Sequence, residues 1–224
     1  MDYRVISIGA LSHHELWAKQ GPTRTAHATC TLVRSDGRVI LVDPGLPAQV
    51  IVARLAERTG LAPEDVTDVF LTNFRPAHRW GLEAFTGARW LISEMERETI
   101  GRSLVERFAQ ASDDDETRKL LEHDIALLKR CSAVPDRLAE QVDLFPMPGF
   151  TPGTCGLLLS HVNSTTLIAG DAVATAEHLA QGRVLRGCYD ADEARNSFME
   201  AVEIADVIIP GHDNLTLNPT RRPM

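Results

Sequence analysis

The chain has 224 residues, of which 44% are hydrophobic and 24% are charged, and its formal net charge is −8. This composition is typical of a soluble globular protein with a sizeable core, and the negative charge argues against nucleic acid or an anionic membrane as a partner, since both need a basic face. No apolar run approaches the ~18 residues of a membrane span, and no secretory signal is visible. The four cysteines form no CxxC pair, which fits reduced thiols and a cytoplasmic protein.

The first half of the chain predicts strands and one helix. Residues 28–45, ATCTLVRSDGRVILVDPG, predict two strands joined by a turn at Ser35-Asp36-Gly37, because an Asp-Gly pair is a strong hairpin signal. Residues 47–60 have the apolar spacing of a helix that ends at Gly60. Residues 68–72, DVFLT, then predict a short buried strand that leads into a polar turn.

The middle of the chain, residues 93–130, predicts helices. Ser93 and Glu96 have the spacing of a capping box, in which each side chain bonds the backbone amide of the other residue. Three aspartates at 113–115 suit the first turn of a second helix, where the helix dipole favours anions. One face of that second helix carries Leu121, Ile125 and Leu128.

Strands return after Pro135. Residues 141–149 predict a strand that runs into a loop, residues 156–173 predict two strands around a turn at Asn163-Ser164, and residues 190–205 predict an amphipathic helix. Residues 206–213, DVIIPGHD, predict a last buried strand. Because no linker rich in Pro, Gly or Ser divides the halves, we expect one domain over residues 1–224, with a helical insertion at about 93–135.

Five loops combine a strand end with polar residues, which is where a rigid scaffold usually presents a site. They read LVDPGLP at 41–47, LTNFRPAHRWG at 71–81, MPGFTPGT at 147–154, AGDA at 169–172 and PGHD at 210–213. In this order the loops resemble the motifs of the metallo-beta-lactamase fold superfamily, from about residue 28 to residue 213. The resemblance implies an α+β protein, a four-layer αββα sandwich with a helical stretch between its two halves and a metal site at one edge of the sheets.

Four positions depart from the family motifs. Asn73 and Arg75 stand where the family has its first two histidines, Ala77 stands at the aspartate of the same motif, and Phe150 replaces the histidine of the PGHTPG loop. Phenylalanine cannot coordinate a metal, and arginine is a permanent cation. At about 5 Å and an effective dielectric near 20, its repulsion of a dication would be roughly 6–7 kcal/mol. The resemblance therefore implies a degenerate member without a dinuclear site, in which Asn73, Arg75 and Phe150 contact a small-molecule ligand.

Three positions keep the family's ligands. His78, Asp171 and His212 form a set of two histidines and one carboxylate, which suits a single zinc or ferrous ion with water as a further ligand. These three residues are therefore the predicted metal ligands and catalytic residues. Asp43, in the family's DxG element, is interpreted as a carboxylate that fixes its loop, and His27 is weighed as a substitute ligand.

Three hypotheses follow. The first is a protein without metal or catalysis, in which Arg75 bonds Asp171 at about 2.7–2.9 Å and the pocket binds a small anion or acyl ligand. The second is a hydrolase with a single metal ion that acts on an ester, thioester or lactam-like bond. The third is a hydrolase without metal, in which His78 or His212 is a general base and Cys155 is the only thiol expected near the site.

Overall fold

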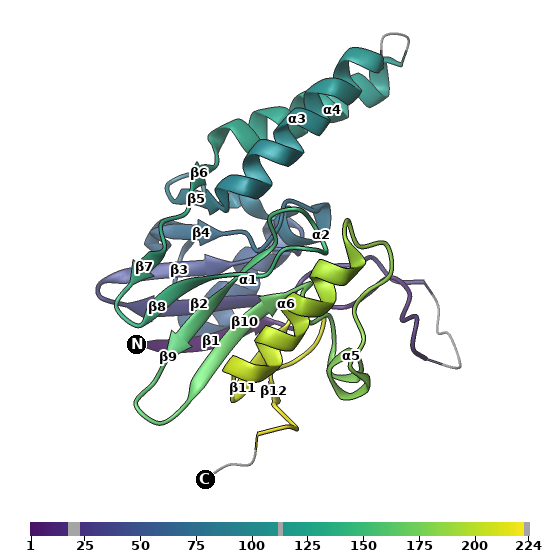
Figure 1. Ribbon diagram of the computed structural model, residues 1–224. Coiled ribbons are helices and arrows are strands. Elements are labelled where there is room, and N and C mark those ends of the chain that lie inside the picture. Colours follow the sequence, from purple (N-terminus) through teal and green to yellow (C-terminus); the bar gives the residue numbers. More distant parts are fainter. Residues whose placement is uncertain (18–22, 112–113, 222–224) are drawn as a thin grey trace.

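The computed structural model describes residues 1–17, 23–111 and 114–221, and there two β-sheets face each other between outer helices (Figure 1). The strands of the first sheet, in spatial order, are β1 (Asp2–Ser7), β2 (Cys30–Ser35), β3 (Arg38–Val42), β4 (Asp68–Phe70), β5 (Arg89–Ile92) and β6 (Ser132–Ala133). The strands of the second sheet, in spatial order, are β12 (Thr216–Leu217), β11 (Val207–Pro210), β10 (Thr165–Gly170), β9 (Cys155–Ser160), β8 (Val142–Pro146) and β7 (Arg137–Ala139).

The helices are α1 (Ala48–Thr59), α2 (Pro76–Arg79), α3 (Glu94–Gln110), α4 (Asp115–Arg130), α5 (Ala176–Gln181) and α6 (Ala191–Ile204), with two short 3₁₀ segments at Pro63–Asp65 and Leu82–Ala84. Helices α1 and α6 pack on the outer faces of the two sheets, and the α3–α4 pair extends away from them (Figure 1). The predicted α+β class and the αββα sandwich are confirmed. That residues 1–224 act as one domain stays a prediction. Among the described residues no helix combines the length and apolar character that crossing a membrane requires.

The two sheets are buried on both faces, which explains their long apolar runs. Side chains alternate between the faces of a strand, so neighbours in sequence enter different layers. In β4, Phe70 points into the layer between the sheets, whereas Val69 packs on the outer helices. In β10, Ile168 enters the same inner layer, whereas Leu167 packs toward α6. Three apolar layers therefore hold four layers of secondary structure together.

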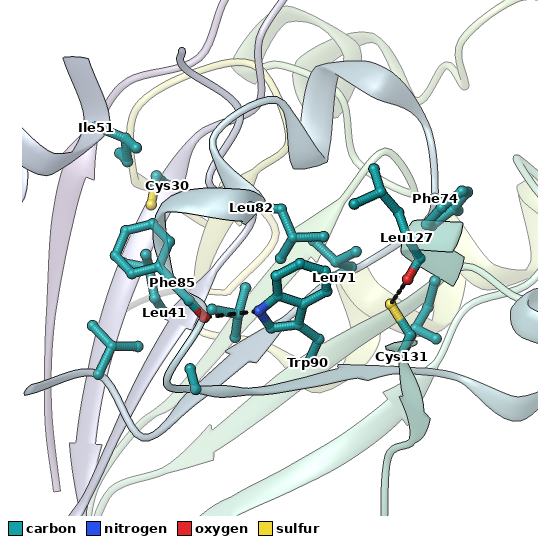
Figure 2. Packing of buried hydrophobic residues seen from close by; sticks show 14 of the residues in the cluster. Cys30, Leu41, Ile51, Leu71, Phe74, Leu82, Phe85, Trp90, Leu127 and Cys131 are labelled. Carbon is teal, nitrogen blue, oxygen red and sulfur yellow. Dashed lines mark hydrogen bonds between the residues drawn. The ribbon is translucent and has the colours of Figure 1, made fainter. Parts of the chain in front are cut away.

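The outer layer beneath α1, α3 and α4 is the most aromatic part of the core (Figure 2). Phe85 and Trp90 pack there beside Leu82, and the Trp90 indole N–H donates to the carbonyl of Phe85 at 2.9 Å. The thiol of Cys131 packs at the other side of this layer and donates to the carbonyl of Leu127 at 3.4 Å. The polar atoms of these large side chains are thus satisfied while their apolar parts are buried.

Local signals explain most element ends. The β2–β3 hairpin turns at Asp36 and Gly37, which have φ values of 49° and 71°, as the predicted two-residue turn requires. Helix α1 ends at Gly60 in the left-handed conformation. The Asp114 side chain caps α4 by accepting from the amides of Glu116 and Thr117. Asp113, predicted in the same acidic turn, lies outside the described residues.

The predicted capping box at the start of α3 forms only in part. Ser93 accepts from the amide of Glu96 at 3.1 Å, as predicted. The Glu96 carboxylate, which is fully buried, does not return to Ser93 but accepts from the amides of Phe74 at 3.0 Å and Gly153 at 2.9 Å. Phe74 follows β4 and Gly153 precedes β9, so one carboxylate joins α3 to loops from both sheets.

Replacing Glu96 should therefore destabilise the protein. Glu96→Ala leaves two buried amides without a partner, and each such amide costs about 1–3 kcal/mol, so we expect the free energy of unfolding to fall by about 2–6 kcal/mol. Glu98→Ala, on an exposed position of the same helix, is the matched control and should change it by less than about 0.5 kcal/mol. Urea unfolding measures both; equal stabilities of the two variants would contradict the role given to Glu96.

Candidate functional site

The polar loops converge at the edge where parallel strands end. Strands β3 and β4 are parallel neighbours in the first sheet, and β10 and β11 are parallel neighbours in the second. Because parallel strands have their carboxyl ends at the same edge, the residues that follow them are brought together. These residues are Asp43 after β3, Thr72 and Asn73 after β4, His78 in α2, Asp171 after β10 and His212 after β11.

His78 lies between two carboxylates. Pro76 begins the short helix α2, which turns the His78 side chain into the interior, where it is fully buried. Its Nδ1 is 3.0 Å from Oδ2 of Asp43, and its Nε2 is 2.9 Å from Oδ2 of Asp171. Burial alone would lower the pKa of His78, but the two carboxylates outweigh it and raise this pKa to about 10. His78 is therefore cationic at neutral pH unless another cation takes the place of its proton.

Asp43 is itself held firmly. Its backbone has a φ of 50°, and its side chain accepts from the amide of Thr72 at 2.9 Å and from the Thr72 hydroxyl at 2.7 Å. The remaining contact of Asp43 is the one to His78 Nδ1. Asp43 thus fixes both the loop after β4 and the orientation of the imidazole, in line with its interpretation as a carboxylate that fixes its loop.

His212 is oriented in a similar way by a backbone carbonyl. Its Nδ1 is 3.0 Å from the carbonyl oxygen of His27, and its Nε2 is 2.9 Å from Oδ1 of Asp171. The ring of His27 lies elsewhere, with its nitrogens 3.2 Å from the carbonyls of Thr25 and Ile8. The His27 ring is therefore not a substitute ligand, and that prediction is wrong. His27 instead orients His212 through its backbone carbonyl, a role that no side-chain pattern indicates.

Asp171 is the centre of the cluster. It is 3% exposed, and its Oδ2 accepts from the Asn73 amide at 2.9 Å. Burial would raise the pKa of Asp171, but His78 and His212 outweigh it and hold this pKa well below its usual range. Its Oδ1 is buried and, among the described residues, receives no hydrogen bond of good geometry, although His212 Nε2 is near. The contact that this oxygen makes with the protein is thus the one to the His212 imidazole.

These atoms have the arrangement of a ligand set. One atom each from His78, Asp171 and His212 lies within 4.8 Å of the others. Ligand atoms around a tetrahedral zinc are about 3.3 Å apart when the bonds are about 2.0 Å long, so small shifts of these side chains would bring the three atoms onto one ion. Each histidine has an acceptor at Nδ1, which leaves Nε2 as the nitrogen that faces Asp171. This pattern of second contacts is typical of metal-binding histidines.

Arg75 does not contact the cluster as one hypothesis required. Its guanidinium carbon lies 4.3 Å from the centre of the Phe150 ring, and Arg75 is exposed. Among the described residues no ion pair joins Arg75 to Asp171, because Asn73, His78 and His212 already surround that carboxylate. The expected Arg75–Asp171 bond is therefore wrong. Arg75 and Phe150 instead form a cation–π pair beside the cluster.

Asn73 and Ala77, the other two departures from the family motifs, have structural contacts. Besides its bond to Asp171, Asn73 accepts from the amide of Arg75 at 2.9 Å, which closes a turn ahead of α2. The Ala77 carbonyl accepts from the amide of Ala28 at 2.8 Å, so α2 is tied to the chain that leads into β2.

The geometry of Cys155 does not support the third hypothesis, a hydrolase without metal. Cys155 is 4% exposed, and its thiol donates to the carbonyl of Gly153 at 3.3 Å. Burial raises the pKa of Cys155 to about 11, so very little thiolate exists at neutral pH. Cys155 is a core residue of the layer between the sheets.

A cavity of about 240 Å³ adjoins His212. The N-terminal segment around His14 and Trp17 forms one wall, where the two rings stack with their centres 4.4 Å apart. Thr175 and Asp213 contribute to the opposite wall. The sequence does not predict this cavity. A loop with two histidines cannot be distinguished from other polar segments until its position next to His212 is known.

Comparisons with known proteins agree with this architecture. A profile of the metallo-beta-lactamase superfamily matches residues 24–212. Among solved structures, AidC, a dizinc quorum-quenching lactonase in complex with a product, has a TM-score of 0.69 at 19% identity, covering 85% of this chain and 74% of its own. A candidate metallo-beta-lactamase from Thermotoga maritima has a TM-score of 0.70 at 18% identity, covering 96% and 98%.

A variant of AiiA from B. thuringiensis, with N-decanoyl-L-homoserine bound at its active site, has a TM-score of 0.66 at 20% identity, covering 94% of this chain and 92% of its own. No curated protein sequence is significantly similar to the chain. The structural likenesses, all at low identity, describe the fold, whereas the profile match covers most of the chain. The protein therefore belongs to the metallo-beta-lactamase superfamily.

Proposed function

We propose that this protein is a hydrolase with a single metal ion, zinc or ferrous iron, held by His78, Asp171 and His212. The observation that carries the proposal is the convergence of these three buried side chains, with both imidazole Nε2 atoms 2.9 Å from the Asp171 carboxylate. Three protein ligands with room for water are the usual set of a catalytic zinc. When bound, such an ion polarises a carbonyl and lowers the pKa of water to about 7.

The other residues of the site would prepare the ligands. Asp43 and the His27 carbonyl hold Nδ1 of the two histidines, so both rings present Nε2 without rearrangement. Asn73 donates to one oxygen of Asp171 and leaves the other for the ion. A carboxylate, two oriented imidazoles and their buried partners form a preorganised set, which lowers the cost of binding the ion.

In this proposal the protein does not bind the second metal ion of a dinuclear enzyme. Asn73, Arg75, Ala77 and Phe150 occupy the motif positions where the family supplies the remaining ligands, and Arg75 brings a permanent positive charge. We propose that Arg75, which is exposed, and the adjoining Phe150 instead contact a small-molecule substrate, while the predicted contact with Asn73 would need the buried Asn73 amide to be uncovered. The cation–π pair of Arg75 and Phe150 offers such a molecule an apolar ring edge and a charged group side by side.

The substrate class is an ester, lactone, thioester or lactam-like bond in a small molecule. The cavity of about 240 Å³ next to His212 can receive only a modest acyl or ring group. Two of the similar structures hold homoserine derivatives, as the AidC product and the AiiA ligand show, and AidC is a lactonase. These likenesses support a lactone or related ester as the first substrate to test.

The second candidate function is binding of a small acyl or anionic ligand without catalysis. The observation that favours it is the loss of four ligand types from the motifs, with Arg75 and Phe150 packed together in their place. In this case the proton on His78, rather than a metal ion, would balance the charge of Asp171. Metal content separates the two candidates directly.

One prediction of this proposal concerns Asp171. Protein purified without added metal should contain about one zinc or iron ion per chain, and Asp171→Asn should lower this content at least about tenfold, because the ligand charge is lost. Hydrolysis of a panel of activated esters and lactones should fall with it. Elemental analysis by mass spectrometry and a spectrophotometric assay measure both.

Asp115→Asn, at an exposed position in the first turn of α4, is the matched control and should keep both metal and activity. If the purified protein holds no metal and binds none in titration, the hydrolase proposal fails and the candidate without catalysis stands.

The next prediction concerns Asp43, whose role is to keep the proton of His78 on Nδ1. Asp43→Asn preserves the shape and tolerates the positive φ, but its amide would face Nδ1 as a donor and favour the opposite tautomer. We expect the affinity for zinc to fall about 10–100-fold, measured by competition with a chelator.

Asp68→Asn provides the control for the loss of a buried carboxylate. Asp68 lies at the start of β4 and pairs with Arg38 and Arg89, away from the cluster. This variant should lower stability without changing zinc affinity; an unchanged affinity in Asp43→Asn would show that Asp43 does not orient the ligand.

A further inference from the structure

A second cavity lies between the end of α5 and the start of α6, on the segment that joins them. Its volume is about 390 Å³, and its walls come from residues 182–188 together with Ala191 and Arg195. The same segment continues into the candidate site, because the amide of Tyr189 donates to the Phe150 carbonyl at 3.1 Å and the amide of Asp190 donates to the Gly149 carbonyl at 2.9 Å.

The charge of this cavity is opposite to that of the whole chain. Arg183, Arg186 and Arg195 line it, and no aspartate or glutamate does, although the chain has a net charge of −8. Arg186 pairs with Glu15 at 3.4 Å, and Arg195 pairs with Asp192. Among the described residues Arg183 has no ion pair. The arginines therefore gather at this cavity without an equal number of acids to balance them there.

Arg75 extends the positive charge toward the candidate site. Its guanidinium lies over Phe150, whose carbonyl anchors the cavity segment. Cys188 lines the cavity; burial and the Glu15 carboxylate raise the pKa of its thiol, while Arg195 and Arg75 act in the opposite direction. Arg75 thus acts on the cavity while it also contacts Phe150 of the loop beside the candidate site.

We propose that this cavity binds the carboxylate or phosphate group of a small molecule whose reacting bond lies at the candidate site. Guanidinium groups bind both oxyanions through paired hydrogen bonds, and three of them around one cavity suit a group with two or three oxygens. That the anion belongs to the substrate rests on the proposed function; that the cavity binds the anion does not.

Cys188 provides a probe located in the cavity itself. The other three thiols, of Cys30, Cys131 and Cys155, are buried, whereas Cys188 is half-buried, so alkylation should reach Cys188 first. The protein as purified is treated with iodoacetamide at constant ionic strength, with increasing inorganic phosphate or, in a second arm, malonate. Mass spectrometry of the peptide that contains Cys188 gives the rate.

Phosphate or malonate should slow the alkylation of Cys188 in a saturable manner, and the arm with the tighter binding identifies the preferred oxyanion. Arg183→Gln and Arg195→Gln should each weaken the protection about tenfold or more, because each removes a charge-assisted hydrogen bond. Arg102→Gln, the same change at an exposed position of α3, is the matched control and should leave it intact.

Asp171→Asn separates this site from the candidate metal centre. Protection that survives in Asp171→Asn but weakens in the arginine variants supports the proposal, even if the protein proves to hold no metal and to hydrolyse nothing. The absence of saturable protection in both arms overturns it, as does protection that is unchanged in the variant lacking both Arg183 and Arg195. Protection lost only in Asp171→Asn places the anion at the metal centre and also overturns it.

Discussion

The buried carboxylate of Asp171 needs positive charge close by, and this need organises the site. Taking an unpaired carboxylate out of water is costly, so a buried one persists only when cations or hydrogen-bond donors surround it. Asn73 and His78 meet Asp171 from the segment after β4, and His212 meets it from the loop after β11. The loops after β4, β10 and β11 therefore have to converge. Whether the positive charge is held by protons or by a metal ion, the same four residues must stand where they do.

The direction of the strands brings these loops together. Parallel neighbours in each sheet end at the same edge, and the layer between the sheets, with Phe70 and Ile168 in it, sets the distance between the two groups of loops. Asp43 and Glu96 then fix the loops individually, because each carboxylate accepts from buried backbone amides. Apolar packing thus gives the site its coarse position, and buried acids give it its final geometry.

Much of this arrangement could be predicted from the sequence, for identifiable reasons. The Asp-Gly turn, the glycine at the end of α1 and the uninterrupted apolar strands are local signals, and local sequence determines them. Strand β1 and helix α5 have weaker signals: β1 is exposed at alternate residues along one edge, and α5 is only six residues long. They acquire their structure from the neighbours they pack against, so no pattern in their own residues predicts them firmly.

Some residues of the candidate site could likewise be predicted from the sequence, and others could not. Motif spacing indicates His78, Asp171 and His212, because their loops follow strands in a fixed order. The direction of Arg75 could not be predicted, since a long side chain can turn toward an acid or toward a ring, and Phe150 provides the ring only after folding. The backbone carbonyl of His27 and the arginines around the second cavity also depend on tertiary placement, which residue type alone does not reveal.

The attachment of α3 also has an evolutionary consequence. The α3–α4 pair extends away from the sandwich (Figure 1), yet its first turn contains Glu96, which bonds loops from both sheets. The outer end of the pair is thus open to lengthening, shortening or exchange during divergence, whereas its root is constrained along with the chemistry. A change in the length of the outer end of this pair would therefore leave the bonds of Glu96 in place.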